Sequence, residues 1–321
     1  MRKIPAALAV LGLVTVGLAG CSMPGSSSDC SRPAVSDADV MDLIDVTGDT
    51  EDQPEVDVYT PLHAPHLAYE DVVTGDGTPI TAQNQLMVVD VALFSGTTGE
   101  PIVATAYDGD LSRVSSPDQW TTNFPGFEDA LQCAAEGSRI AVALSPDDMS
   151  PDVSVGFGLD EEDTVVAVVD LRKVYLPAAD GQNQFNSGFG LPTVVRAPDG
   201  QPGLIIPDGA PPTDLVVQTL KKGTGETVTG DQPVRVHYSG VVWGEDETFD
   251  STWGDQPASV TADSVVPGFA KALDGQTVGS QVLVVVPPDQ GYGDDANGAV
   301  PAGSTLVYVI DILGVDVPPA E

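Results

Sequence analysis

Short stretches in which apolar and polar residues alternate recur along the last third of the chain. The stretch V-R-V-H-Y at 234–238 has the two-residue period of a half-buried strand. An acidic turn around Gly244 leads to a second short strand that ends in F-D-S. Tyr238 and the pair Phe249 and Asp250 are therefore predicted to lie on neighbouring strands, where inward side chains meet across the ladder.

The same patterns predict the remaining elements of this region. Pro267 opens a short helix that carries Phe269 and Leu273 on one face. Many strands with one short helix packed against them predict an α+β fold, in which an antiparallel sheet wraps around a helix. The predicted strands are 215–221, 234–241, 249–251, 282–286 and 306–313.

An earlier part of the chain repeats these motifs in the same order. P-G-F at 125–127 parallels P-G-F at 267–269, and T-V-V-A-V-V-D at 164–170 parallels T-L-V-Y-V-I-D at 305–311. Collinear matches of this kind indicate an internal duplication. We therefore predict one domain at 53–177 and a second at 213–316.

The two copies differ where chemistry is expected. The counterpart of Tyr238 is Asp90 by counting from the preceding glycines, or Phe94 by matching the Ser-Gly pairs that follow. The stretch 102–104, which matches the Phe249–Asp250 region, has no carboxylate. The first domain is therefore predicted to be structural or a binding module.

Charge and the N-terminus bear on location. Acidic residues outnumber basic ones 48 to 12, for a formal net charge of −36, which argues against nucleic acid as a partner. Two basic residues, an apolar run and L-A-G-C predict a lipoprotein signal peptide at 1–20, with lipid attached to Cys21. An ordinary secretory signal with an incidental cysteine is the alternative. We expect a protein anchored by lipid on the extracytoplasmic face of the cell membrane.

Composition predicts two irregular segments. A flexible tether is expected at 21–52 and a Pro/Gly-rich linker at 178–212. Outside the cytoplasm two further cysteines are more often joined than free, so we predict a Cys30–Cys133 disulfide. Two separately buried thiols or an intermolecular bridge are the alternatives. His63 and His66 lack a third ligand nearby in sequence, so no metal site is predicted.

Several short motifs follow one another between about 213 and 315. These are V-x-V-H-Y-x-G, F-D-S, V-V-P-G-F (265–269), V-G-S (278–280), P-P (287–288), G-Y-G (291–293), V-P (300–301) and T-L-V-Y-V-I (305–310). In their order, and nearly in their spacing, they resemble the FK506-binding-protein type of peptidyl-prolyl isomerase.

The resemblance implies a pocket for an X–Pro bond and no cofactor. It implies catalytic roles for Tyr238, Phe249, Asp250 and Tyr292, and substrate contacts from Val265, Val266, Phe269, Val300 and Tyr308. Tyr292 and the Val266 N–H would bind peptide carbonyls, and macrolide ligands would fit the same pocket. Three departures bear on activity: Phe269 replaces the usual tryptophan, the loop after Thr252 is shorter, and the arginine that usually pairs with the carboxylate is missing.

Together these features predict a prolyl isomerase that acts on proline-containing exported proteins. Rotation about an X–Pro bond faces a barrier of roughly 18–20 kcal/mol. An apolar pocket favours the twisted amide, which has less charge separation than either planar isomer, without covalent chemistry. The alternative is an adaptor or holdase that binds proline-containing segments without isomerising them.

Overall fold

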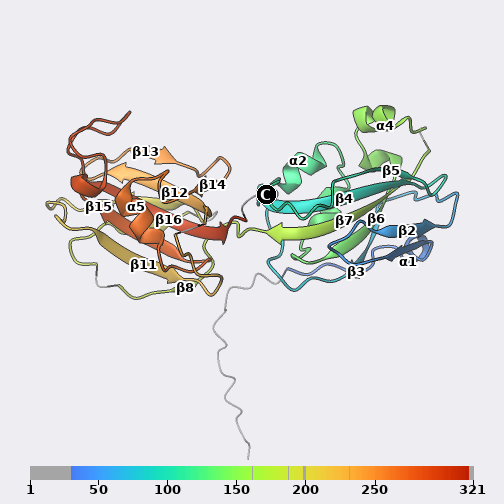
Figure 1. Cartoon of the computed structure of the whole chain (residues 1–321), viewed down its shortest axis with the longest axis horizontal. Helices are drawn as coiled ribbons and strands as arrows, with labels where there is room; N and C mark the ends of the chain where they lie inside the picture. The colour runs from blue at the N-terminus through green and yellow to red at the C-terminus, as the bar shows by residue number, and fades with distance from the viewer. Residues whose placement is uncertain (1–29, 161, 187, 198–199, 231, 318–321) are drawn as a thin grey trace, which may run out of the picture.

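Two antiparallel sheets form the cores of two domains that lie next to each other along the longest axis of the molecule (Figure 1). The predicted α+β class is confirmed, since a few short helices accompany the sheets. No helix in the described part of the chain is long and apolar enough to span a membrane. The predicted signal peptide and Cys21 lie outside the described residues. The computed structural model describes residues 30–160, 162–186, 188–197, 200–230 and 232–317.

The first domain is built on a five-stranded sheet in which every neighbouring pair is antiparallel. Its three inner strands are buried along nearly their whole length, as continuous apolar runs such as I-A-V-A-L predict. In spatial order the strands are β3 (Ala68–Val73), β6 (Arg139–Leu144), β7 (Val165–Val174), β4 (Met87–Ser95) and β5 (Pro101–Ala104).

Both faces of this sheet are covered. One face packs against α2 (Pro117–Thr121) and α3 (Phe127–Leu131), whose apolar side chains join the largest core of the domain. The connection from β6 to β7 contains the 3-10 helix η1 (Pro146–Asp148) and the helix α4 (Pro151–Phe157). Side chains from the N-terminal segment and the loop that follows it complete a smaller core on the other face.

The tether predicted at 21–52 is wrong for its described part. Residues 30–52 include α1 (Ala38–Met41) and β1 (Ile44–Thr47), which pairs with β2 (Glu55–Val58). Val40, Met41 and Val46 are buried against the sheet. These few apolar side chains stand among many Asp, Ser and Thr residues, so composition alone did not reveal that they cover the second face of the sheet.

Covalent and ionic links tie this N-terminal segment to the domain. A disulfide joins Cys30 to Cys133. The fully buried Arg139 binds Asp170 on β7 through Nε and Nη2, at 2.7 and 3.0 Å. The same guanidinium donates hydrogen bonds to the carbonyl oxygens of Gly48 at 2.8 Å and Asp52 at 2.7 Å. The segment is therefore part of the first domain.

The second domain has the same architecture. Its helix α5 (Pro267–Leu273) packs against β15 on one face of the sheet, and η2 (Pro288–Gln290) follows β15. The strand order is β13 (Thr248–Ser251), β12 (Val234–Val242), β16 (Leu306–Val315), β15 (Gln281–Val286), β11 (Val216–Lys222) and β8 (Gln182–Asn183), and β14 (Ala258–Val260) also pairs with β12.

The strand orders match copy for copy, with β3, β6, β7, β4 and β5 in the places of β11, β15, β16, β12 and β13. The duplicated segments end in Asp170 and Asp311. Val91 on β4 pairs with the residue before Asp170, and Tyr238 on β12 pairs with the residue before Asp311. Val91 is therefore the counterpart of Tyr238, and both Asp90 and Phe94 are wrong. Counting failed because the loop after the glycine motif differs by one residue between the copies.

The segment predicted as a linker at 178–212 is largely packed on the second domain. It supplies β8 and the hairpin of β9 (Thr193–Arg196) and β10 (Pro202–Ile205). Apolar side chains of the hairpin region, Leu191 and Leu204 among them, cover the sheet face opposite α5. Phe185 and Phe189 in the same segment are fully exposed.

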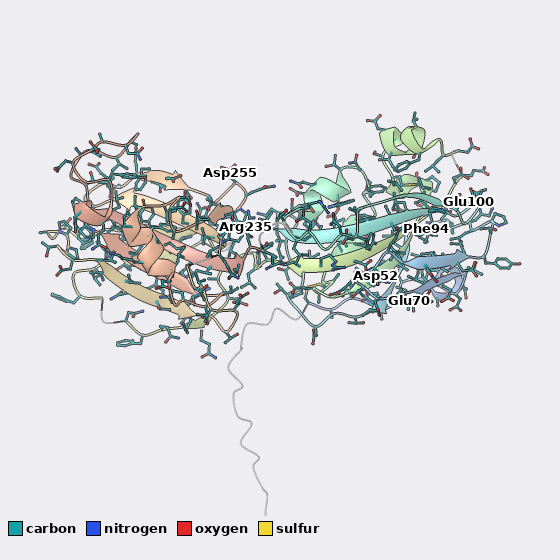
Figure 2. All side chains as sticks on the ribbon, viewed as in Figure 1. Asp52, Glu70, Phe94, Glu100, Arg235 and Asp255 are labelled. Atoms are coloured by element: carbon teal, nitrogen blue, oxygen red, sulfur yellow. A yellow bond between two sulfur atoms is a disulfide. The ribbon has the colours of Figure 1, made fainter. Side chains whose placement is uncertain are left out.

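The domains meet where β7 runs on into Tyr175. The N–H of Leu176 donates to the carbonyl oxygen of Leu313 beyond the middle of β16, at 3.1 Å. The ring of Tyr175 lies against Gly314, where an added Cβ would come within 2.5 Å of its Cδ1 atom. Arg235, at the end of the second domain that faces the first, places its guanidinium 5.5 Å from the centre of that ring (Figure 2).

Candidate active site

Four aromatic rings from four elements of the second domain meet on the α5 side of the sheet. Tyr308 on β16 is central, with ring centroids 5.1 Å from Phe269, 5.7 Å from Phe249 and 6.2 Å from Tyr238. Tyr238 and Phe269 are 5.5 Å apart and nearly perpendicular. Such edge-to-face pairs are favourable because a positive ring edge meets a negative ring face. The structure thus brings together the rings that the sequence analysis grouped.

A glycine makes room for two of these rings. Gly240 on β12 lies directly opposite Tyr308 on β16. A Cβ at this position would lie 2.8 Å from Tyr308 Cε1 and 2.9 Å from Phe249 Cζ. Any larger residue would therefore displace both rings, so the absence of a side chain shapes this wall.

A β-bulge turns two consecutive side chains of β13 toward the same site. Gly240 pairs with Asp250 and Val241 with Thr248, which leaves Phe249 as the extra residue. Consecutive side chains of a regular strand point to opposite faces, and a bulge relaxes this alternation. Phe249 consequently contacts Tyr308, while Asp250 reaches the hydroxyl of Tyr238.

The remaining walls come from the start of α5 and the segment after η2. Val265, Val266 and Tyr292 are half-buried and pack against the ring cluster, and Val300 is buried. Val266 is the N-cap residue of α5, in extended conformation. Within the described residues no group accepts a hydrogen bond from its N–H. All nine residues predicted for the site therefore line one region of the domain.

One polar contact crosses the opening of this region. The Tyr238 hydroxyl donates to Oδ2 of the exposed Asp250 at 2.6 Å. Burial, followed by the nearby Asp250 carboxylate, raises the pKa of Tyr238. Burial also raises the pKa of Tyr308, to which Tyr292 adds. The phenols of Tyr238 and Tyr308 therefore keep their protons at neutral pH, and Tyr238 is a hydrogen-bond donor.

This arrangement suits binding and desolvation of an apolar group rather than covalent chemistry. The walls are aromatic rings and valines with a single carboxylate at the rim, the pattern of a small-ligand or peptide pocket. In the described part of the chain no group of three His, Cys, Asp or Glu side chains is placed to hold a metal ion. A peptide inserted here would exchange water for aromatic surface.

The corresponding region of the first domain has lost these features. The strand registers of the two domains place Val91 at the position of Tyr238 and Val103 at the position of Asp250. Phe127 occupies the place of Phe269, and Phe124 stacks on it with centroids 5.2 Å apart. The indole of Trp120 lies 6.2 Å from the same ring, so side chains of the domain itself pack in the space where the second domain has its pocket.

Some functional features were not predicted from the sequence. The bulge at Phe249 and the room left by Gly240 depend on cross-strand register, for which the sequence pattern gave no signal. His237, which precedes Tyr238 on β12, is a packed structural residue: it is buried on the opposite face of the sheet and stacks on Trp253 with centroids 4.6 Å apart. Burial lowers the pKa of His237 to about 4.

Comparison with known proteins agrees with this geometry. Residues 224–313 match the family of FKBP-type peptidyl-prolyl cis-trans isomerases. A probable FK506-binding protein of Corynebacterium glutamicum is 32% identical over 114 residues, which cover 35% of this chain and 97% of that protein. An FK506-binding protein of Streptomyces anulatus is 31% identical over 120 residues, covering 36% of this chain and 97% of the relative.

A longer relative matches in part. The FKBP-type isomerase FkpA of Escherichia coli K12 is 33% identical over 108 residues, 34% of this chain and 39% of that protein. The crystal structure of FkpA from Escherichia coli covers 42% of this chain and 54% of its own, with 28% identity and a TM-score of 0.31. With two short relatives matched over nearly their whole length, the chain belongs to the family of FKBP-type peptidyl-prolyl cis-trans isomerases, and its second domain carries that activity.

Proposed function

We propose that isomerisation takes place among the four rings of the second domain, with Tyr238, Phe249, Asp250 and Tyr292 as the catalytic residues. The observation that supports this most strongly is the convergence of rings from four elements around Tyr308, beside a carboxylate bound to a phenol. Val265, Val266, Phe269, Val300 and Tyr308 contact the substrate.

The pocket lowers the barrier by solvation rather than by bond making. The twisted X–Pro amide has less charge separation than the planar isomers, so an apolar site stabilises it more than water does. A million-fold acceleration requires about 8 kcal/mol of differential binding. Removal of water and a few hydrogen bonds formed in the twisted state supply this free energy.

Two donors orient the peptide on either side of the proline. The Val266 N–H lacks a partner within the described residues and binds one substrate carbonyl oxygen, while the Tyr292 hydroxyl binds another. The Asp250 carboxylate, held by the Tyr238 hydroxyl, lies at the rim, next to the rotating amide. The same rings offer a surface for macrolide ligands.

The clients are proline-containing proteins outside the cytoplasm, and the enzyme is anchored to the membrane by lipid on Cys21. The signal-like sequence at 1–20 supports this location. The Cys30–Cys133 disulfide also favours an oxidising compartment. The first domain is a non-catalytic module, because its equivalent positions carry Val91 and Val103.

A protease-coupled prolyl isomerase assay on the full chain tests the assignment of the site. Tyr238→Ala removes a wall and a donor, so kcat/KM should fall about tenfold or more, and Asp250→Ala should cause a smaller loss. Val103→Ala, the matching position in the first domain, is the control and should leave the rate unchanged. Wild-type rates in both second-domain variants would refute this site.

A further inference from the structure

The edge of the sheet next to Tyr238 has a gap between two strands. β13 pairs with β12 from Ser239 onward, and β14 pairs with β12 up to Val236. Tyr238 therefore lies between the two partner strands, where regular ladder bonds are not available on this edge. Without a partner on this edge, the backbone N–H and carbonyl oxygen of Tyr238 would lack hydrogen bonds, although β16 pairs with β12 on the other edge.

Thr252 fills the gap with both its backbone and its side chain. Its N–H donates to the carbonyl oxygen of Tyr238 at 3.1 Å, and its Oγ1 accepts from the N–H of Tyr238 at 3.0 Å. The hydroxyl of Ser251 also donates to the Tyr238 carbonyl oxygen, at 3.1 Å. The Thr252 hydroxyl thus replaces the backbone carbonyl that a continuing strand would supply.

A buried histidine holds this hydroxyl in place. Oγ1 of Thr252 lies 2.9 Å from Nδ1 of His237, and both residues are buried. The tautomer of the imidazole sets the direction of this bond: either the hydroxyl donates to Nδ1, or Nδ1–H donates to Oγ1. The imidazole in turn stacks on Trp253, with an interplanar angle of 21°. These contacts lock the threonine rotamer behind the pocket.

Thr252 lies two residues after Asp250, whose carboxylate accepts the hydrogen bond from the Tyr238 hydroxyl. No salt bridge to Asp250 is found in the described part of the chain, so no cation orients this carboxylate. Its position relative to Tyr238 is determined at one end by the 2.6 Å hydrogen bond and at the other by the bonds of Thr252. Any slip of 250–252 along β12 would break both sets of bonds together.

We infer that Thr252, held by His237, is a positioning residue of the isomerase, which keeps the Tyr238 phenol and the Asp250 carboxylate in hydrogen-bonding register. The inference rests on the function proposed above for Tyr238 and Asp250. Thr252 does not touch the substrate and acts only through this pair.

The test compares Thr252→Val, which keeps the shape and removes the hydroxyl, with Thr252→Ser, which keeps the hydroxyl. In the full chain, Thr252→Val should lower kcat/KM about three- to tenfold, the effect of one lost hydrogen bond, and Thr252→Ser should stay within about twofold of wild type. Thr277→Val is the matched control. Its hydroxyl donates to Gly223 at 2.7 Å, outside the proposed site, and its loss should leave kcat/KM unchanged.

A double-mutant cycle separates positioning from general destabilisation. In a Tyr238→Phe background the phenol–carboxylate bond is already absent, so Thr252→Val should lower kcat/KM by less than about twofold. An undiminished loss in that background, or no rescue by serine, would overturn the inference. So would a reduced rate for Tyr238→Phe with a normal rate for Thr252→Val. A normal rate for Tyr238→Phe itself would instead refute the proposed role of Tyr238, and the inference with it.

Discussion

The buried ion pair of the first domain permits a quantitative test of how the two domains depend on each other. Arg139 is fully buried and bonds Asp170 through two nitrogens. The equivalent position of the second domain is Gln281, which donates to Asp311 at 2.6 Å. Arg139→Gln therefore gives the aspartate of the first domain the same uncharged amide partner that the aspartate of the second domain has.

The expected loss is large because the buried Asp170 carboxylate loses the cation to which it is hydrogen-bonded. Removing one partner of a buried pair typically destabilises by about 3–5 kcal/mol, and the bonds from Arg139 to Gly48 and Asp52 are lost as well. For a domain of this size about 4 kcal/mol lowers the melting temperature by roughly 8–16 °C. Differential scanning calorimetry of the full chain should show this shift in the first-domain transition.

The pH dependence supplies a second criterion. Burial raises the pKa of Asp170 even with Arg139 present. Without the guanidinium the pKa rises further, and the penalty of the ionised carboxylate disappears as pH falls below it. The difference between variant and wild type should therefore be smaller at pH 5 than at pH 8.

The control and the readout of activity complete the test. Arg113 bonds Asp108 on the exposed surface of the same domain, so Arg113→Gln should change stability by less than about 1 kcal/mol. Below the melting temperature of the variant, isomerase activity should stay at the wild-type level because the pocket lies in the other domain. A shift as small as that of Arg113→Gln, or one independent of pH, would refute this account of the pair.

Three further predictions concern the junction, the buried histidine and the disulfide. Gly314→Val should push the Tyr175 ring away and separate the domains, so the radius of gyration from X-ray scattering should increase, and an unchanged value would contradict this interface. The NMR resonance of His237, assigned with His237→Phe, should titrate near pH 4. Because the pKa of His237 is lower in the folded than in the unfolded protein, its contribution to stability falls as the pH drops from about 6.5 to about 4. An ordinary histidine pKa would refute its burial as a neutral imidazole. Replacing Cys30 and Cys133 with serine opens a link of sequence separation 103, which should destabilise the first domain by about 2–5 kcal/mol; equal melting temperatures for this variant and wild type would refute a stabilising role.

The strands of the second domain could be predicted because their apolar periods are long and their motifs follow one another in order. The boundaries agree to within two residues for strands such as β12 and β16. The segments at 21–52 and 178–212 were misjudged for a common reason. Each supplies only a few apolar side chains, such as Met41 and Leu204. These side chains pack against a sheet face that strands distant in sequence form, so their role is not visible in the local sequence.

By itself the sequence singled out Tyr238, Phe249 and Asp250 as candidate site residues, since they stand in a recognisable pattern. It also determined the α+β class, because strand periodicity and one short helix are local properties. Only the tertiary structure decided how these residues act together. The bulge that turns Phe249 and Asp250 to one side, and the threonine that closes the gap behind Tyr238, arise from register between strands. Register is set by packing across the whole sheet, so a local stretch of sequence does not contain it.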